Sequence, residues 1–339
     1  MKFHDTEIGV GMSHQLKYTV NCSLLFTELP LLERPAAARR AGFSAVEFWW
    51  PFVEAVPPER QVDAFVNAVT DAGVQLTGLN FFAGDMPGGD RGLVSWPKRS
   101  SEFRDNVDVT VGIGERLGTQ GFNALYGNRV DGSSEQEQDD IAVENFALAA
   151  KAAARIGATV LVEPVSGADR YPLKVASDAL AVIDRVQAAY DVPNVGLLAD
   201  LYHLAVNGDD VDRVIAEHTD RIAHVQIADA PGRNEPGTGT LPLESQLAAL
   251  ADHGYDGWDG GFADVASVWQ RDLPGVRCGA RDREPVGEPA YRWSRHVSGR
   301  SPLRACGYRA DADRAGVRTG VQHRLGRSCG AGDVCRGRW

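Results

Sequence analysis

Four side chains of this sequence have the types and spacing of a site that holds a divalent cation and moves a proton. They are Glu163, Asp200, His203 and Gln226. Carboxylate and amide oxygens suit a hard cation, and a neutral imidazole either ligates the cation or hydrogen-bonds a substrate. A carboxylate in such a cluster can also accept and return a proton, which is general acid and base chemistry on a small polar substrate.

Each of these residues comes at or close to the end of an apolar segment. The segments are 159–163, 195–200 and 222–228, and their aliphatic or β-branched residues run with little polar alternation, which predicts buried parallel strands. In a parallel α/β barrel the carboxyl ends of the strands converge on one mouth, where the chemistry is carried out. We therefore expect the four side chains to lie together at that mouth.

Three of the four side chains also have structural alternatives. A buried carboxylate needs a cation or hydrogen bonds, so Glu163 is either a metal ligand that exchanges a proton with substrate or a cap on a neighbouring loop. Asp200 and His203 are three positions apart and predict a shared position on one side of a turn at the site. In the alternative, Asp200 caps the N-terminus of a helix and His203 lies on the helix surface.

Two further polar residues fall inside predicted strands. Strand alternation places His224 and Gln226 on the same face of segment 222–228, with His224 deeper. We expect His224 to be a core histidine satisfied by its neighbours, and Gln226 to be the ligand or substrate contact. Glu47 belongs to another buried strand and is either a substrate contact or a structural partner for an arginine.

Two loops at strand ends carry the remaining candidates. Arg233 lies in a loop rich in proline and glycine, where its planar guanidinium suits a substrate carboxylate; a solvated surface arginine is the alternative. Asn80 begins a glycine-rich loop, 80–92, that we predict to be a lid. This loop lacks the Lys-Ser/Thr ending of a phosphate-binding loop.

Strands and helices alternate along the sequence, which predicts an α/β fold of the (β/α)8 TIM barrel type. The predicted strands are 18–23, 45–48, 75–80, 121–126, 159–163, 195–200 and 222–228, with a weak eighth strand at 257–262. The predicted helices are 30–41, 59–72, 102–117, 135–156, 175–190, 209–218 and 243–253. A doubly wound open sheet would carry a glycine-rich turn after the first strand, and residues 21–26 have none.

The pattern divides the chain into three parts. Residues 1–15 are polar without a period and predict a flexible leader, and residues 16–262 form the predicted barrel domain, whose last βα unit is atypical. Residues 263–339 form an atypical tail rich in Arg, Gly and Cys that we expect to be poorly ordered. Its composition resembles a reading frame shifted in GC-rich DNA; a basic interaction tail is the alternative.

Charge and hydropathy exclude several classes of protein. Residues 1–258 contain 20 Lys and Arg against 37 Asp and Glu, a formal charge of −17, which argues against binding to a nucleic-acid backbone. The chain contains no apolar run long enough to cross a membrane, and its N-terminus has no secretory signal pattern. We expect a cytoplasmic protein, with a homo-oligomer as its possible assembly.

At these residues the sequence resembles the hydroxypyruvate isomerase family, within the xylose-isomerase-like barrel superfamily. The resemblance covers about residues 17–258 and rests on segments 21–30, 41–48, 80–92, 162–164, 200–203 and 226–239. It implies a barrel enzyme that interconverts hydroxypyruvate and tartronate semialdehyde, a small hydroxy-keto acid pair, by moving a proton through an enediolate. A sugar is the alternative type of substrate.

The resemblance also implies roles for individual residues. Glu163, Asp200 and Gln226 would be ligands of Mg²⁺ or Mn²⁺, and Glu163 would also be a catalytic proton-transfer group. His203 and Arg233 would bind substrate; we add Glu47 and Asn80 as substrate contacts.

The sequence departs from the family at several positions. Phe262 stands where the last strand should carry the second proton-transfer glutamate, which would also be a metal ligand. Asn123 replaces a frequent histidine, Asn234 a loop histidine and Thr240 a loop glutamate. Phe262 is expected to affect whether the protein is active, and the other three departures are expected to affect which substrate it accepts.

Three alternatives to a hydroxypyruvate isomerase remain. A 2-oxo-tetronate isomerase or sugar epimerase would use the same chemistry. A non-catalytic binding protein is suggested by Phe262. An abasic-site endonuclease would need a histidine-rich cluster of three zinc ions and a basic face, which the acidic body and eight histidines disfavour.

Overall fold

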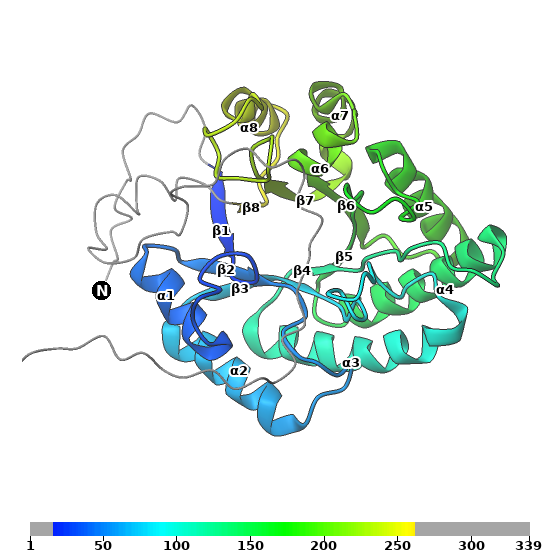
Figure 1. Cartoon of the computed structure of the whole chain (residues 1–339), viewed down its shortest axis with the longest axis horizontal. Coiled ribbons are helices and arrows are strands. Elements are labelled where there is room, and N and C mark those ends of the chain that lie inside the picture. Colours follow the sequence, from blue (N-terminus) through cyan, green and yellow to red (C-terminus); the bar gives the residue numbers. More distant parts are fainter. Residues whose placement is uncertain (1–15, 262–339) are drawn as a thin grey trace, which may run out of the picture. The chain divides into compact units, whose positions relative to one another are not determined.

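The computed structural model describes residues 16–261, and within them eight parallel strands form a closed barrel surrounded by helices (Figure 1). The strands are β1 (Lys17–Asn21), β2 (Ala45–Phe48), β3 (Gln75–Asn80), β4 (Gly121–Asn123), β5 (Thr159–Val162), β6 (Val195–Asp200), β7 (Ile222–Ile227) and β8 (Trp258–Gly261). The helices are α1 (Arg34–Arg40), α2 (Glu59–Ala72), α3 (Ser100–Leu117), α4 (Glu135–Ala154), α5 (Ala176–Tyr190), α6 (Leu201–Val206), α7 (Val211–His218) and α8 (Leu243–Asp252). Short 3-10 turns are η1 (Leu31–Glu33), η2 (Pro97–Arg99) and η3 (Thr219–Arg221).

The eighth strand closes the barrel and confirms the predicted TIM fold. β8 pairs in parallel with β1, where Thr19 is aligned with Gly260, and with β7, where Val225 is aligned with Asp259. Each strand therefore pairs with the strands before and after it, so this sheet has no open edge. The predicted leader, 1–15, and the tail, 263–339, lie outside the described residues, and these domain boundaries remain predictions.

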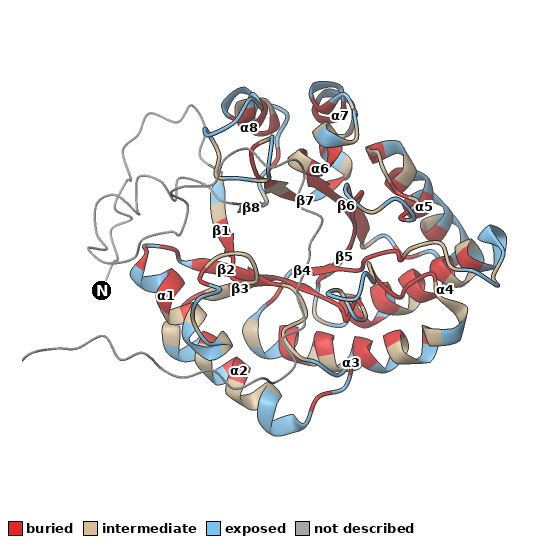
Figure 2. Cartoon of the chain, viewed as in Figure 1, coloured by how far each residue is buried: buried red, intermediate tan, exposed pale blue. Residues whose placement is uncertain are grey.

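Each helix covers the barrel with its apolar face. α2 buries Phe65, Val66 and Val69 against the strands, and Phe48 of β2 meets Phe65 edge-on at a ring-centroid distance of 5.2 Å. Figure 2 shows the same division around the barrel, with buried residues on the strands and inner helix faces and exposed residues outside. This is the two-layer burial that the apolar strands and amphipathic helices predict.

The bounds of most elements shift by one or more residues from the prediction, and two differences lie next to the site. α6 is not among the predicted helices and corresponds to the alternative in which Asp200 caps a helix; it starts directly after β6 because Oδ1 of Asp200 accepts a hydrogen bond from the backbone N–H of His203 at 3.1 Å. β4 ends at Asn123, three residues earlier than expected. Beyond it the chain leaves the sheet, and the backbone N–H of Tyr126 donates to the hydroxyl of Tyr171 at 3.0 Å.

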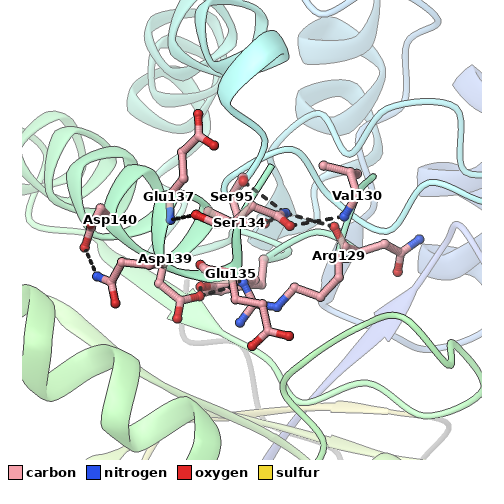
Figure 3. Close-up of polar contacts among 12 residues, drawn as sticks. Ser95, Arg129, Val130, Ser134, Glu135, Glu137, Asp139 and Asp140 are labelled. Carbon is pink, nitrogen blue, oxygen red and sulfur yellow. Dashed lines mark hydrogen bonds and ion pairs between the residues drawn. The ribbon is translucent and has the colours of Figure 1, made fainter. Parts of the chain in front are cut away.

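The loop that follows β4 is fixed by the first turns of α4 (Figure 3). Ser134 caps this helix by accepting a hydrogen bond from the backbone N–H of Glu137 at 3.1 Å. Arg129 pairs with Asp139 at 2.7 Å. The pairing of Arg129 with Asp139 therefore ties this loop to α4.

Within residues 16–261, no helix is long and apolar enough to cross a membrane.

Candidate active site

The structure brings the predicted cluster together at the carboxyl ends of β5, β6 and β7. Glu163 follows β5, Asp200 ends β6, and Asp200 is aligned with Gln226 of β7 in the parallel register. Glu163, Asp200 and His203 are all buried and offer ligand atoms that lie within 4.8 Å of one another. The grouping expected from strand ends is therefore present, and the individual roles remain predictions.

The two carboxylate oxygens of Asp200 have different partners. Oδ1 caps α6 through the backbone N–H of His203, whereas Oδ2 accepts a hydrogen bond from Nη2 of Arg233 at 2.9 Å. Asp200 thus caps a helix, as the alternative interpretation expects, while its other oxygen lies in the cluster, and its role as a metal ligand stays a prediction. His203 is 6% exposed and does not lie on the helix surface.

His203 presents a hydrogen-bond donor to the cluster. Its Nδ1 lies 3.2 Å from the backbone nitrogen of Ser166, which can only donate, and 2.7 Å from the Ser166 hydroxyl. Burial lowers the pKa of His203 to about 4, with Asp200 opposing that shift, so the ring is neutral at pH 7. A neutral ring that accepts at Nδ1 carries its proton on Nε2. This Nε2 atom lies 3.6 Å from Oδ2 of Asp200 and 3.9 Å from Oε1 of Glu163.

With its proton on Nε2, His203 has a different role from the carboxylates of the cluster. A metal-bound Nε2 would require the proton on Nδ1, where it would oppose the Ser166 N–H. The geometry therefore favours His203 as a donor to a substrate oxygen over His203 as a metal ligand. Ser166 was not predicted, since its proximity to His203 depends on the loop after β5.

Glu163 is a buried carboxyl group that can exchange a proton near neutral pH. Burial raises its pKa to about 8, the nearby Asp200 charge adds to the shift, and the hydrogen bond from Asn123 opposes it. Nδ2 of Asn123 donates to Oε2 of Glu163 at 2.6 Å. Oδ1 of Asn123 is buried and meets no hydrogen-bond partner within the described part of the chain.

Glu47 is not paired with an arginine, which was one of the two roles considered from the sequence. It is 4% exposed, and its donors are Asn21, His224 and Gln226, none of them an arginine. His224 is buried and hydrogen-bonded, as predicted for a core histidine. A direct contact between Glu47 and substrate stays a prediction.

Asn80 and Arg233 complete the mouth. Asn80 ends β3, is 8% exposed, and is aligned with Asn123 of β4, so its position is next to the Glu163 partner. The Arg233 side chain is 22% exposed and lies 5.7 Å from the ring of Tyr202. Its bond to Asp200 contradicts the alternative of a solvated surface arginine. Substrate binding by either residue stays a prediction.

The loop that carries Arg233 is built around one carboxylate. Asp229 accepts hydrogen bonds at 2.8 to 3.0 Å from the backbone N–H groups of Ala230, Gly237, Gly239 and Leu241. Asp229 is 1% exposed, so these bonds replace its lost hydration. Its function as a loop anchor was not predicted, although the residue lies in a segment that carried the resemblance.

The donor set fits a divalent cation that prefers oxygen. Glu47, Glu163 and Asp200 are three buried carboxylates, and Arg233 is a cation in contact with Asp200. Burial is the main cause of the raised pKa of Glu163 and the charge of Asp200 adds to it; a divalent cation would oppose both effects. Glu163, Asp200 and the amide oxygen of Gln226 are the ligands that suit Mg²⁺ or Mn²⁺. On the next strand, Gly260 is aligned with Gln226 and offers no side chain.

A separate cavity of about 450 Å³ opens at the opposite end of the barrel. Thr77, Thr159, His224 and Tyr255 are among its lining residues, and Gly121 and Ile222 mark the amino ends of β4 and β7 there. That end of a TIM barrel supports stability, whereas chemistry is carried out at the other. We therefore assign the site to the mouth that contains Glu163 and Asp200.

Comparison with known proteins agrees with the fold. The family model of the xylose isomerase-like TIM barrel matches residues 35–261. The chain belongs to this family. Within it, the chain is 55% identical over 255 residues to a putative hydroxypyruvate isomerase of Streptomyces coelicolor, which covers 74% of this chain and 91% of the relative.

More distant members of the family carry two activity names. Hydroxypyruvate isomerase of Escherichia coli is 30% identical, covering 72% of this chain and 92% of the relative. The 2-oxo-tetronate isomerase of Cupriavidus necator is 32% identical, covering 72% and 91%. Among solved structures, a protein from Brucella melitensis described as AP endonuclease, family 2, is 32% identical with a TM-score of 0.66, covering 73% and 92%. D-allulose 3-epimerase from Methylomonas sp., 17% identical with a TM-score of 0.60 and covering 76% and 90%, shares the fold.

Proposed function

We propose that this protein is a ketol isomerase that interconverts hydroxypyruvate and tartronate semialdehyde. The observation that carries the proposal is the buried Glu163 carboxyl, whose pKa is raised to about 8 beside Asp200 and the Nε2 proton of His203. A carboxyl group with such a pKa exchanges its proton near neutral pH, and its ionised form accepts a proton from substrate. The names of the relatives from Streptomyces coelicolor and Escherichia coli support this substrate pair.

The proposed reaction moves one proton between neighbouring carbons. Glu163 removes a proton from C3 of hydroxypyruvate, the C3–H electron pair forms the C2–C3 double bond, and the substrate becomes an enediolate. Return of the proton to C2 and transfer of the hydroxyl proton from the oxygen on C3 to the oxygen on C2 give the aldehyde. His203 donates a hydrogen bond from Nε2 to a substrate oxygen, and Arg233 binds the carboxylate.

A divalent cation would complete this site. Glu163, Asp200 and Gln226 would hold Mg²⁺ or Mn²⁺, which when bound would polarise the carbonyl and hydroxyl oxygens of the substrate. We propose that Asn80 and Glu47 also belong to the part of the mouth that binds substrate.

The residue at position 262, which follows β8 in the sequence, is proposed to limit the rate of turnover. Phe262, at the position expected for the second glutamate, lies outside the described residues. We propose that the chain retains proton removal by Glu163 and returns the proton to C2 slowly. Replacing Phe262 by Glu is expected to raise turnover. Cation binding with neither isomerisation nor proton exchange would favour a non-catalytic binding protein instead.

A 2-oxo-tetronate isomerase is the second candidate, favoured by the relative from Cupriavidus necator. Parallel assays with hydroxypyruvate, a 2-oxo-tetronate and D-allulose decide between the candidates, since the preferred substrate has the highest kcat/KM. Preference for the four-carbon acid would replace the first proposal. Preference for the six-carbon sugar would indicate an epimerase.

Nucleic-acid cleavage is not favoured, even though the Brucella melitensis protein is described as an AP endonuclease. The buried ligand cluster at the mouth contains a single histidine, and residues 1–258 are strongly acidic. A cytoplasmic location and a homo-oligomeric state stay predictions.

A further inference from the structure

We infer that Glu47 is a positioning residue that fixes the side-chain amide of Gln226, so that its oxygen is presented to a divalent cation. This inference rests on the proposed function, because it concerns the same cation. It assigns Glu47 a task other than contact with substrate or pairing with an arginine.

The hydrogen bond between the two residues determines which way the amide faces. Nε2 of Gln226 donates to Oε1 of Glu47 at 2.6 Å, across the barrel from β7 to β2. An ionised carboxylate can only accept, so the NH₂ group must face it, and the reversed amide would bring two oxygens together. Oε1 of Gln226 is therefore on the side away from Glu47. In the strand register the neighbour of Gln226 is Asp200.

Glu47 is itself held in place by contacts that do not involve the ligands. Nδ2 of Asn21 donates to Oε1 at 2.9 Å, and Nε2 of His224 lies 2.9 Å from Oε2. The neighbouring strand makes room for it, because a Cβ built on Gly78 would lie 3.3 Å from Cβ of Glu47 and 3.4 Å from its Oε2. The carboxylate is thus bonded through both oxygens and closely surrounded, and its orientation is fixed before a cation arrives.

The charge of Glu47 adds to its geometric effect. A hydrogen bond from an amide NH₂ to a carboxylate is stronger than one between neutral groups, and it shifts electron density towards the amide oxygen. The result is a ligand oxygen that is both oriented and more basic. Partners that hold a ligand in this way change metal affinity by about 10- to 100-fold when they are mutated.

The test is a double-mutant cycle read out by Mn²⁺ affinity. Dissociation constants of Mn²⁺ are measured by electron paramagnetic resonance on the full chain, the Glu47→Gln and Gln226→Ala variants, and the double variant. A glutamine at 47 can pair with Gln226 in either orientation, so the ligand amide is no longer locked. We expect Glu47→Gln to weaken Mn²⁺ binding about tenfold or more. In the Gln226→Ala background the same substitution should have no further effect.

A matched control separates positioning from general loss of packing. Thr77→Val removes another buried polar pair of the barrel interior, in which the Thr77 hydroxyl lies 2.8 Å from that of Thr19 and contacts no proposed ligand. It is expected to lower the melting temperature and leave Mn²⁺ affinity unchanged. Thermal unfolding of every variant is recorded beside the titrations.

The outcomes are distinguishable from failure of the proposed function. Unchanged Mn²⁺ affinity in Glu47→Gln, or an equal loss in both backgrounds, would overturn the positioning role and leave the isomerase proposal standing. If the parent protein binds no Mn²⁺, the cation site and the positioning role are both wrong. The isomerase proposal is then judged by its own activity assay.

Discussion

Nη2 of Arg233 donates to Oδ2 of Asp200 at 2.9 Å, and the other oxygen of that carboxylate is bound to the N-terminus of α6. Oδ2 is therefore the oxygen left for a cation, and Arg233 is bound to it. A guanidinium and a divalent cation repel each other at one oxygen, so they should compete for it.

Arg233→Met is expected to bind Mn²⁺ more tightly than the parent in the absence of substrate. Removing the competing bond is worth roughly 1.5 kcal/mol, or about tenfold in the dissociation constant. The same variant should raise KM for hydroxypyruvate, because the carboxylate loses its partner. Mn²⁺ titration and initial-rate kinetics measure the two effects. Weaker Mn²⁺ binding in the variant would show that Arg233 supports the cation site and does not compete with it.

Glu163→Gln should abolish proton transfer while leaving the fold almost unchanged. The amide cannot accept the substrate proton, so kcat is expected to fall by about 10²- to 10⁴-fold. Its oxygen can still accept the hydrogen bond from Asn123, which limits the change in the free energy of unfolding to about 1 kcal/mol. Steady-state kinetics and urea unfolding provide the measurements. Turnover equal to that of the parent would remove Glu163 from the mechanism.

Cation affinity should rise with pH up to about 8 and then level off. The pKa of Glu163 is raised to about 8, so below that pH the cation must displace a proton from its ligand. Isothermal titration with Mn²⁺ at pH 7 in buffers of different ionisation enthalpy should reveal proton release. Glu163→Gln should show none. Equal heats in all buffers for the parent would contradict the raised pKa.

The raised pKa of Glu163 also determines how the free energy of unfolding of the cation-free protein changes with pH. A folded-state pKa above the ordinary 4.5 favours folding at low pH, and this contribution is lost as the pH rises through about 8. The pKa of His203 is lowered to about 4, so its contribution is present above pH 6.5 and is lost as the pH falls towards 4. Between pH 6.5 and 8 the loss of stability caused by Glu163 should therefore be larger than any change caused by His203. Bound Mn²⁺ should offset this loss.

Alanine substitutions at Gly89 and Gly92 test whether the predicted lid packs against the loop after β4. A Cβ on Gly92 would lie 1.9 Å from the carbonyl oxygen of Leu125, whereas one on Gly89 meets nothing within 4 Å. Both have a positive φ, 104° and 109°, so each alanine variant pays a similar backbone strain of about 1–2 kcal/mol. Gly92→Ala should cost about 1–3 kcal/mol more in urea unfolding, because it also overpacks the loop after β4. Equal losses would contradict this close approach.

Much of the fold could be predicted because buried parallel strands have an unmistakable composition. β2, β3, β6 and α2 have the bounds expected from sequence, since apolar runs and helical periodicity there end at clear polar or glycine boundaries. The six-residue α6 entered only as the alternative in which Asp200 caps a helix, because one and a half turns show no period. The convergence of Glu163, Asp200, His203 and Gln226 followed from strand order alone.

The partners of these side chains could not be predicted. Glu47 and Gln226 are 179 positions apart, and only the closed barrel brings them together. The contact of Ser166 with His203, which decides the tautomer, depends equally on a loop whose path has no sequence signal. The sequence therefore predicted which residues gather at the mouth, and the structure shows how they are oriented.

The most direct test of the account is proton exchange at C3 of hydroxypyruvate in D₂O, followed by ¹H nuclear magnetic resonance with Mg²⁺ present. The parent protein should replace the C3 protons with deuterium and form tartronate semialdehyde more slowly than it exchanges them. The Glu163→Gln variant should do neither. Exchange that is as fast without the protein, or as fast with the variant as with the parent, would contradict the claim that Glu163 abstracts the proton.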